Sequence, residues 1–210
     1  MSCPCLCGVT LVNTGLPNCQ SIADVTASLL FVRSKNSTGV TPSISTLVLP
    51  LPNNTLSALI NAVNVNDRIY PLKGFKQVKN ERSESIKETF DDGTSTIIRK
   101  GVKSFEAIIP NVGSQYMCQI DGLSCGEWSA YVVDKSGQLI GLKTSTLGQV
   151  IPIPISAGSI DIKTMDKTET TVAKIMINFD WSMTACDCDL VYLDKSNLGT
   201  NEPLALNGLL

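Results

Sequence analysis

The amino-acid sequence predicts a β-rich α+β fold, a twisted sheet or small sandwich with two short helices and a long protruding β-hairpin. Three patterns lead to this prediction. Apolar and polar side chains alternate through residues 173–183, as expected of a strand with one buried face. Apolar runs at 128–133 and 138–142 flank the turn sequence Asp-Lys-Ser-Gly. Residues 75–110 contain an Asp-Gly step between two β-prone runs, which is a strong hairpin signal.

Shorter patterns predict the remaining elements. Further strands are expected at residues 28–33, 45–51 and 102–109. One short amphipathic helix is expected after the capping sequence Asn-Asn-Thr at 53–55, with apolar residues at helical spacing from Leu56 to Val63. A second short helix is expected over 111–123, where Tyr, Met and Ile recur at helical spacing. Two helices against several strands complete the α+β prediction.

The predicted hairpin has arms at Ser85–Phe90 and Thr94–Lys100, and both arms carry charged side chains. Such a ribbon cannot hide both faces in one core, and an isolated two-stranded ribbon is marginally stable in water. We therefore expect it to pair with an identical subunit. The residues expected at this interface are Ser85, Lys87, Phe90, Asp91, Asp92, Gly93, Thr94, Ile97, Arg99 and Lys100.

Composition indicates one globular domain with tails. Apolar residues make up 43% of the chain and charged residues 17%, which favours a packed core. We expect a Cys-rich arm at 1–22, a β domain at 23–185 and a C-terminal arm at 186–210 that is extended and needs partners to be ordered. The net charge of −2 gives no overall attraction to nucleic acid or to an acidic membrane. We expect a soluble chain without a secretory signal, because no apolar run approaches a membrane span.

The sequence offers little for catalysis. Histidine, the commonest general base, is absent, and neither a nucleophile elbow nor a phosphate-binding loop is present. Asp91 and Asp92 are interpreted as turn residues rather than as cation ligands. Trp128 and Trp181 lie in apolar-patterned strands, so we expect them to anchor the core. We therefore expect neither enzymatic activity nor a cofactor.

The cysteines and a group of basic residues leave alternatives open. Cys3, Cys5, Cys7, Cys186 and Cys188 form two clusters that a metal or a disulfide would join, or that are free thiols in a reducing cytoplasm. The metal signal is weak, because the spacing is C-x-C. Lys76, Lys79 and Arg82 are spaced by three and would fan out on a strand. They belong either to a solvated edge or to a ring that points them at nucleic acid in a central channel.

Several segments together resemble virion structural proteins of crAss-like tailed bacteriophages. They are ADVT at 23–26, RIYPLKGFKQVKNERSE at 68–84, ETFDDGTSTIIRKGVKSFEAII at 88–109, YVVDKSGQLIG at 131–141 and KIMINFDW at 174–181. The resemblance covers roughly residues 22–183. Its most specific part is the acidic-aromatic turn followed by Arg-Lys-Gly-Val-Lys-Ser-Phe.

The resemblance implies a tail-tube-like fold used for rings beneath the portal, in a virion assembled in the host bacterial cytoplasm. The chain would form a homo-oligomeric ring in the head-to-tail connector or tail, around a channel through which DNA passes without sequence readout. The hairpin would extend toward a neighbouring subunit or ring, and other virion rings, the portal or tail proteins would be neighbours. The alternatives are the tail tube protein proper, since one fold serves both positions, and a metal- or disulfide-stapled β module that binds a ligand.

Overall fold

The computed structural model describes residues 25–99, 101–110, 117, 120–165, 173–182 and 189–206. Their strands are β1 (Thr26–Arg33), β2 (Ile44–Ser45), β3 (Ile69–Lys73), β4 (Lys76–Arg82), β5 (Ile86–Thr89), β6 (Ser95–Arg99), β7 (Lys103–Pro110), β8 (Trp128–Asp134), β9 (Leu139–Lys143), β10 (Gln149–Ile151), β11 (Ile153–Pro154), β12 (Asp161–Met165), β13 (Lys174–Asp180) and β14 (Leu190–Leu193). The helices are α1 (Thr55–Ile60) and α3 (Lys195–Leu198), with 3-10 turns η1 (Val65–Asp67), η2 (Gly122–Ser124) and η4 (Pro203–Ala205). Of the described residues, 46% lie in strands, about twice the usual share, so the β-rich prediction is confirmed.

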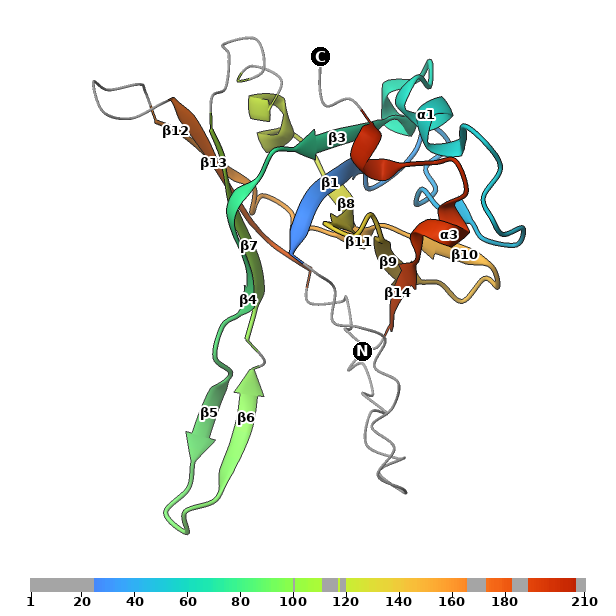
Figure 1. Cartoon of the computed structure of the whole chain (residues 1–210). Helices are drawn as coiled ribbons and strands as arrows, with labels where there is room; N and C mark the ends of the chain where they lie inside the picture. The colour runs from blue at the N-terminus through green and yellow to red at the C-terminus, as the bar shows by residue number, and fades with distance from the viewer. Residues whose placement is uncertain are drawn as a thin grey trace.

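Antiparallel pairing arranges the strands in three sheets (Figure 1). The largest is a curled half-barrel in the order β2-β10-β9-β8-β1-β3, with β11 added to β8 and β14 added to β9. The second sheet has the order β12-β13-β7-β4. The third consists of β5 and β6 alone and extends from the ends of β4 and β7. The chain passes from the first sheet to the second at Gly74, whose φ of 85° favours glycine.

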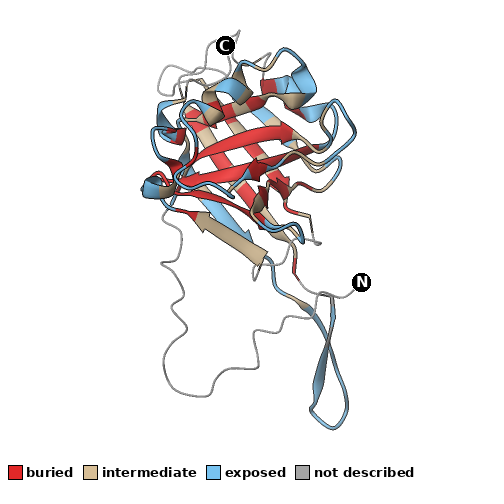
Figure 2. Ribbon diagram, turned by 90° about the vertical axis from the view of Figure 1, so that its right-hand side faces the viewer, coloured by how far each residue is buried: buried red, intermediate tan, exposed pale blue. Residues whose placement is uncertain are grey.

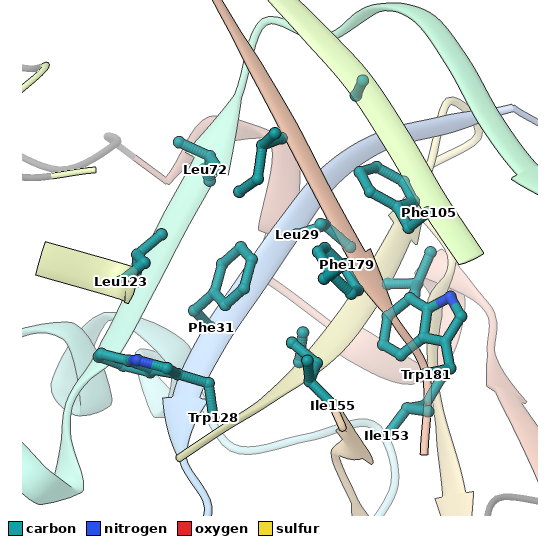
Figure 3. Packing of buried hydrophobic residues seen from close by; sticks show 14 of the residues in the cluster. Leu29, Phe31, Leu72, Phe105, Leu123, Trp128, Ile153, Ile155, Phe179 and Trp181 are labelled. Atoms are coloured by element: carbon teal, nitrogen blue, oxygen red, sulfur yellow. The ribbon is translucent and has the colours of Figure 1, made fainter. Parts of the chain in front are cut away.

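An aromatic core holds the half-barrel against the four-stranded sheet. Phe179 of β13 stacks on Phe105 of β7 at 5.0 Å between ring centroids and meets Phe31 of β1 edge-on at 6.0 Å. Trp181 lies edge-on to Phe179 at 4.9 Å (Figure 3). Trp128 also packs edge-on against Phe31, and both tryptophans are buried, as predicted. Because these rings come from both sheets, their burial fixes how the sheets face each other.

A second core covers the other face of the half-barrel. It unites alternate residues of β1 and β8 with α1, β14 and α3, and includes Leu30, Tyr131, Val133, Leu56 and Leu198. Every residue of β8 is buried, because this strand has packing on both faces. The Tyr131 hydroxyl donates to the carbonyl oxygen of Val150 at 3.2 Å, and burial raises the pKa of Tyr131 well above its usual value. The helices on the right of Figure 1 therefore belong to the fold's second hydrophobic layer.

Most predicted strands are confirmed, with one exception. Strands form at the expected places at 28–33, 102–109, 128–133 and 138–142, and the strand expected at 173–183 forms as β13 over Lys174–Asp180, with Met183 outside the described residues. In β13, Ile175, Ile177 and Phe179 are buried and their neighbours are half-buried, as the alternation predicts. The strand expected at 45–51 is wrong, because only Ile44 and Ser45 pair with β10 and the run then meets Pro50 and Pro52, which lack an N–H group.

The helix predictions are confirmed only in part. The helix after residues 53–55 forms as α1 but ends at Ile60, so Val63 is 95% exposed instead of lying on its apolar face. Asn54, at φ 64°, gives no side-chain cap, and the backbone N–H of Leu56 donates instead to Oδ1 of Asn201 at 3.0 Å. Most of the helix expected over 111–123 lies outside the described residues, although Ile120 is buried in the inter-sheet core.

The C-terminal segment differs from the extended arm expected at 186–210. Its described residues, 189–206, form β14, α3 and η4 and pack on the half-barrel. β14 pairs with β9 in register, with Leu193 opposite Leu139. The side-chain amide of Asn201 donates to the carbonyl oxygens of Pro52 and Leu198 at 2.8 and 3.0 Å. Apolar burial and these hydrogen bonds therefore order the segment within the chain itself.

Candidate assembly interface: the projecting hairpin

The hairpin consists of a stem, formed by β4 and β7 within the four-stranded sheet, and a tip, formed by residues 86–99. The tip's described side chains are exposed, and it projects away from the two packed sheets (Figure 2). At about 3.3 Å per residue, the run from Ser83 to Asp91 carries the turn roughly 25 Å beyond the stem. The predicted protruding hairpin is thus present, and nothing among the described residues covers it.

Local hydrogen bonds specify the turn at the tip. The N–H of Phe90 donates to the carbonyl oxygen of Thr94 at 2.8 Å, and that of Gly93 donates to the carbonyl oxygen of Phe90 at 2.9 Å. Gly93 has a φ of 81°, the left-handed conformation that closes a three-residue hairpin loop. Asp92 accepts hydrogen bonds from the hydroxyl and the N–H of Thr94 at 2.6 and 2.8 Å, which lower the pKa of its carboxyl group. Asp92 therefore acts as a turn residue, as predicted, and carries a negative charge at neutral pH.

One face of the tip carries large apolar side chains in water. Alternation along β5 places Ile86, Glu88 and Phe90 on the same face. Ile98 lies in a bulge opposite Ile86, where the register shifts by one residue. Ile86, Phe90 and Ile98 are 56%, 46% and 63% exposed. The tip is therefore not a purely polar ribbon. Contact of these three side chains with water is unfavourable, so burying them against another surface would be favourable.

The predicted interface residues occupy both strands and the turn. Lys87 lies opposite Ile97, and Arg99 lies opposite Ile86, so these pairs form the ladder of the tip. The Ser85 hydroxyl accepts from the N–H of Gly101 at 3.4 Å where the tip meets the stem. Lys100 lies outside the described residues. Ile86 and Ile98 are exposed but were not among the predicted contacts. The sequence would have placed both on the face of Phe90, because Ile86 lies two residues before Glu88 and Ile98 lies four residues after Thr94.

A compact joint connects the tip to the stem. The N–H of Ser83 donates to the carbonyl oxygen of Val102 at 2.8 Å, and the Ser83 hydroxyl accepts from the N–H of Val102 at 2.9 Å. Nη1 of Arg82 donates to the carbonyl oxygen of Gly101 at 3.0 Å. A Cβ on Gly101 would lie only 1.7 Å from the carbonyl oxygen of Ser83. The two backbones thus approach at this point as only glycine allows.

Substituting Gly101 by alanine should open this joint, because the new methyl group and the Ser83 carbonyl cannot occupy the same space. We expect faster hydrogen exchange across 83–102 and about 1–3 kcal/mol less local stability, in the range of an overpacked site. Mass-spectrometric hydrogen exchange measures this change. Gly122→Ala is the control, since nothing lies within 4 Å of a Cβ there. Equal exchange in the two variants would contradict the tight joint.

The basic residues of β4 do not share one face. Lys76 lies opposite Ile108 and Lys79 opposite Glu106, on the outer face of the sheet, while Arg82 lies opposite Lys103, on the face that carries Phe105. Nζ of Lys79 is 3.4 Å from Oε1 of Glu106, an exposed ion pair worth about 0–1 kcal/mol. Charge on the outer face is balanced, with Lys76, Lys79, Lys163 and Lys174 against Glu81, Glu106, Asp161 and Asp180.

The other candidate chemistry is not brought together in the described residues. Cys3, Cys5, Cys7, Cys186 and Cys188 lie outside them, and Cys125 is exposed and free. Within the described ranges, no three His, Cys, Asp or Glu side chains are placed to hold a metal ion. No described helix has the length and apolar character needed to span a bilayer. Comparison of the chain with protein-family models, curated proteins and solved structures gave no match.

Proposed function

We propose that this chain is a non-catalytic structural protein of a tailed-phage virion, with a tail-tube-like fold. It assembles with copies of itself into a ring in the head-to-tail connector or tail, and the ring surrounds a channel for DNA. The observation that carries the proposal is the projecting tip, whose Ile86, Phe90 and Ile98 are exposed and have no cover among the described residues. Burying them against another copy would gain about 25 cal/mol per Å² of apolar surface removed from water.

Two further observations support this function. The segments that resemble crAss-like phage proteins include the stem, the joint and the turn, so the resemblance is densest in the element that would make the contacts. The balanced charge of the outer face of the four-stranded sheet would neither hold nor repel a passing DNA backbone strongly, which suits a channel without sequence readout. Tail tube and connector ring remain alternative positions for one fold.

The assembly state of the purified chain tests the proposal. We expect light scattering after size exclusion to give a defined oligomer, and electron micrographs to show rings with a central hole. Removing Glu84–Lys100 and joining Ser83 to Gly101 by a short Gly-Ser turn should leave a folded monomer. The joint makes this deletion feasible, because Ser83 and Val102 are already hydrogen-bonded at 2.8 Å.

A face-specific pair of variants is the matched control. Ile86→Thr with Phe90→Ser should weaken assembly at least tenfold, whereas Lys87→Ala with Thr89→Ala on the opposite face should change it much less. A wild-type chain that stays monomeric at high concentration would overturn the proposed function. Rings built by the deletion variant would show that the hairpin is not the contact.

A further inference from the structure

A second group of exposed apolar side chains lies on two loops of the half-barrel. Leu47, Val48 and Leu49 follow β2 and are 69%, 65% and 44% exposed, and Leu147 precedes β10 and is 86% exposed. The loops are neighbours, because the N–H of Thr46 donates to the carbonyl oxygen of Gly148 at 2.7 Å. The side chain of Leu47 also lies directly over Gly148. We call Leu47, Val48, Leu49 and Leu147 the loop patch.

The loop patch is unusual for a surface loop. Single exposed apolar residues are normal, but contiguous ones mark contact surfaces, and connecting loops are generally polar. The hydroxyl-rich sequence of residues 144–146 shows that polar residues fit beside Leu147. Its neighbour Gly148, at φ 72°, closes the turn that presents Leu147 to solvent. The backbone thus displays these side chains instead of folding them into the second core.

Charge identifies a partner for this surface. Residues 139–160, which carry Leu147, contain Lys143 and no acidic residue, whereas Lys35 lies on a loop where Ser37 donates hydrogen bonds to the carboxylate of Asp67. The tip, residues 86–99, contains Lys87 and Arg99 against Glu88, Asp91 and Asp92, so its net charge is 2 − 3 = −1, and both aspartates lie in the turn. An acidic turn beside an apolar face therefore complements an apolar patch beside Lys143.

The two surfaces cannot meet within one chain. In Figure 1 the tip projects at the lower left, while β10 and the loops beside it lie at the right edge of the half-barrel. Figure 2 shows the tip directed away from the packed sheets as well. A contact between two different surfaces of the same protein is heterologous, and repetition of it closes into a ring when the rotation per subunit allows.

We propose that the loop patch is the acceptor for the apolar face of the hairpin tip of a second copy of this chain. Phe90, Ile86 and Ile98 of one copy cover Leu47, Val48, Leu49 and Leu147 of the next, and the acidic turn lies near Lys143. This inference rests on the proposed homo-oligomeric function and specifies which surface of the neighbour receives the hairpin.

Photo-crosslinking tests the contact directly in the full chain. With p-benzoylphenylalanine in place of Phe90, ultraviolet light should join copies within the oligomer, and peptide mapping should place the crosslink at 46–50 or 144–148. A crosslink elsewhere on the neighbouring copy, in an oligomer that forms normally, would overturn the acceptor assignment and leave the proposed function intact. A wild-type chain that does not oligomerise would instead overturn both.

Substitutions provide an independent measurement. Leu147→Asp should weaken assembly at least tenfold, and the control Val63→Asp, at an exposed valine outside the loop patch, should leave it unchanged. Asp91→Lys and Lys143→Glu should each weaken assembly several-fold, and the double variant should recover part of the loss, since the reversed pair attracts again. Normal assembly of Leu147→Asp would contradict the proposal. The proposal would also be contradicted if the losses of assembly in Asp91→Lys and Lys143→Glu simply added in the double variant.

Discussion

Replacing Phe179 by alanine is expected to lower the free energy of unfolding by about 3–5 kcal/mol, as for a large aromatic side chain removed from a packed core. The ring is 1% exposed and contacts Phe31, Phe105 and Trp181, which come from both packed sheets. Truncation would therefore leave a cavity between the sheets and remove three aromatic contacts, each worth about 0.5–1.5 kcal/mol beyond the area buried.

Urea unfolding followed by tryptophan fluorescence measures this loss, at one protein concentration for all variants because oligomers gain stability by mass action. Asn178→Ala is the matched control, since its side chain is the next along β13 and points to the half-buried outer face. We expect a change within about 1 kcal/mol there. A Phe179→Ala variant that unfolds like Asn178→Ala would mean that the two sheets do not depend on the aromatic core.

Strong periodicity and turn chemistry made much of this fold predictable. The alternation that buries Ile175, Ile177 and Phe179 sets which face of β13 enters the core. Asp91-Asp92-Gly93 and Asp134-Lys135-Ser136-Gly137 place glycine where each turn needs a positive φ. In both turns an aspartate accepts hydrogen bonds from following residues, as Asp134 does from the N–H of Gln138 at 2.9 Å. These are local interactions, and a local sequence pattern is sufficient to encode them.

Elements that depend on distant partners were not predictable in this way. β11 consists only of Ile153–Pro154, and the proline argues against a strand. Ile153 nevertheless pairs with Ala130, near the start of β8. β12 is largely exposed and lacks the alternation of a half-buried strand, so only its pairing with β13 reveals it. The apolar run at 45–51 has the composition of a strand but is largely exposed. Its composition misled the prediction, because composition does not tell a buried run from an exposed one.

The candidate interface was predictable as an element but only in part as a surface. The turn sequence and charged arms indicated a hairpin that its own core does not cover. Alternation along each arm indicates that Ile86, Phe90 and Ile98 share a face, but the bulge at Ile98 shifts the register of the two arms, and that shift has no signal in the sequence. The joint at Gly101 likewise arises from the close approach of two separate strands. A Cβ on residue 101 would lie 1.7 Å from the carbonyl oxygen of Ser83.

Asn201→Ala should cost about 2–4 kcal/mol, although the residue lies in a segment that composition marks as a tail. Its side chain is 4% exposed and makes three hydrogen bonds, to the carbonyl oxygens of Pro52 and Leu198 and from the N–H of Leu56. Alanine would leave the N–H of Leu56 buried without a partner, at about 1–3 kcal/mol. It would also remove one donor from each carbonyl oxygen, although the Thr55 hydroxyl still donates to Pro52 and the backbone N–H of Asn201 still donates to Leu198. The N–H of Leu56 is also one that α1 cannot satisfy itself, so the same change removes the cap of the helix.

Thr200→Ala is the control, because the Thr200 hydroxyl donates to Oδ1 of Asn53 in an exposed pair, and its loss should stay within about 0.5 kcal/mol. Asn201→Asp separates packing from hydrogen bonding. It preserves size and the acceptor for Leu56 but replaces the donating amide by a carboxylate that faces two carbonyl oxygens. We therefore expect it to be at least as destabilising as alanine and to recover as the pH falls and the carboxyl group takes up a proton. Hydrogen exchange of β14 and α1 measures both effects, and unchanged protection in Asn201→Ala would mean that apolar burial alone holds residues 189–206 on the half-barrel.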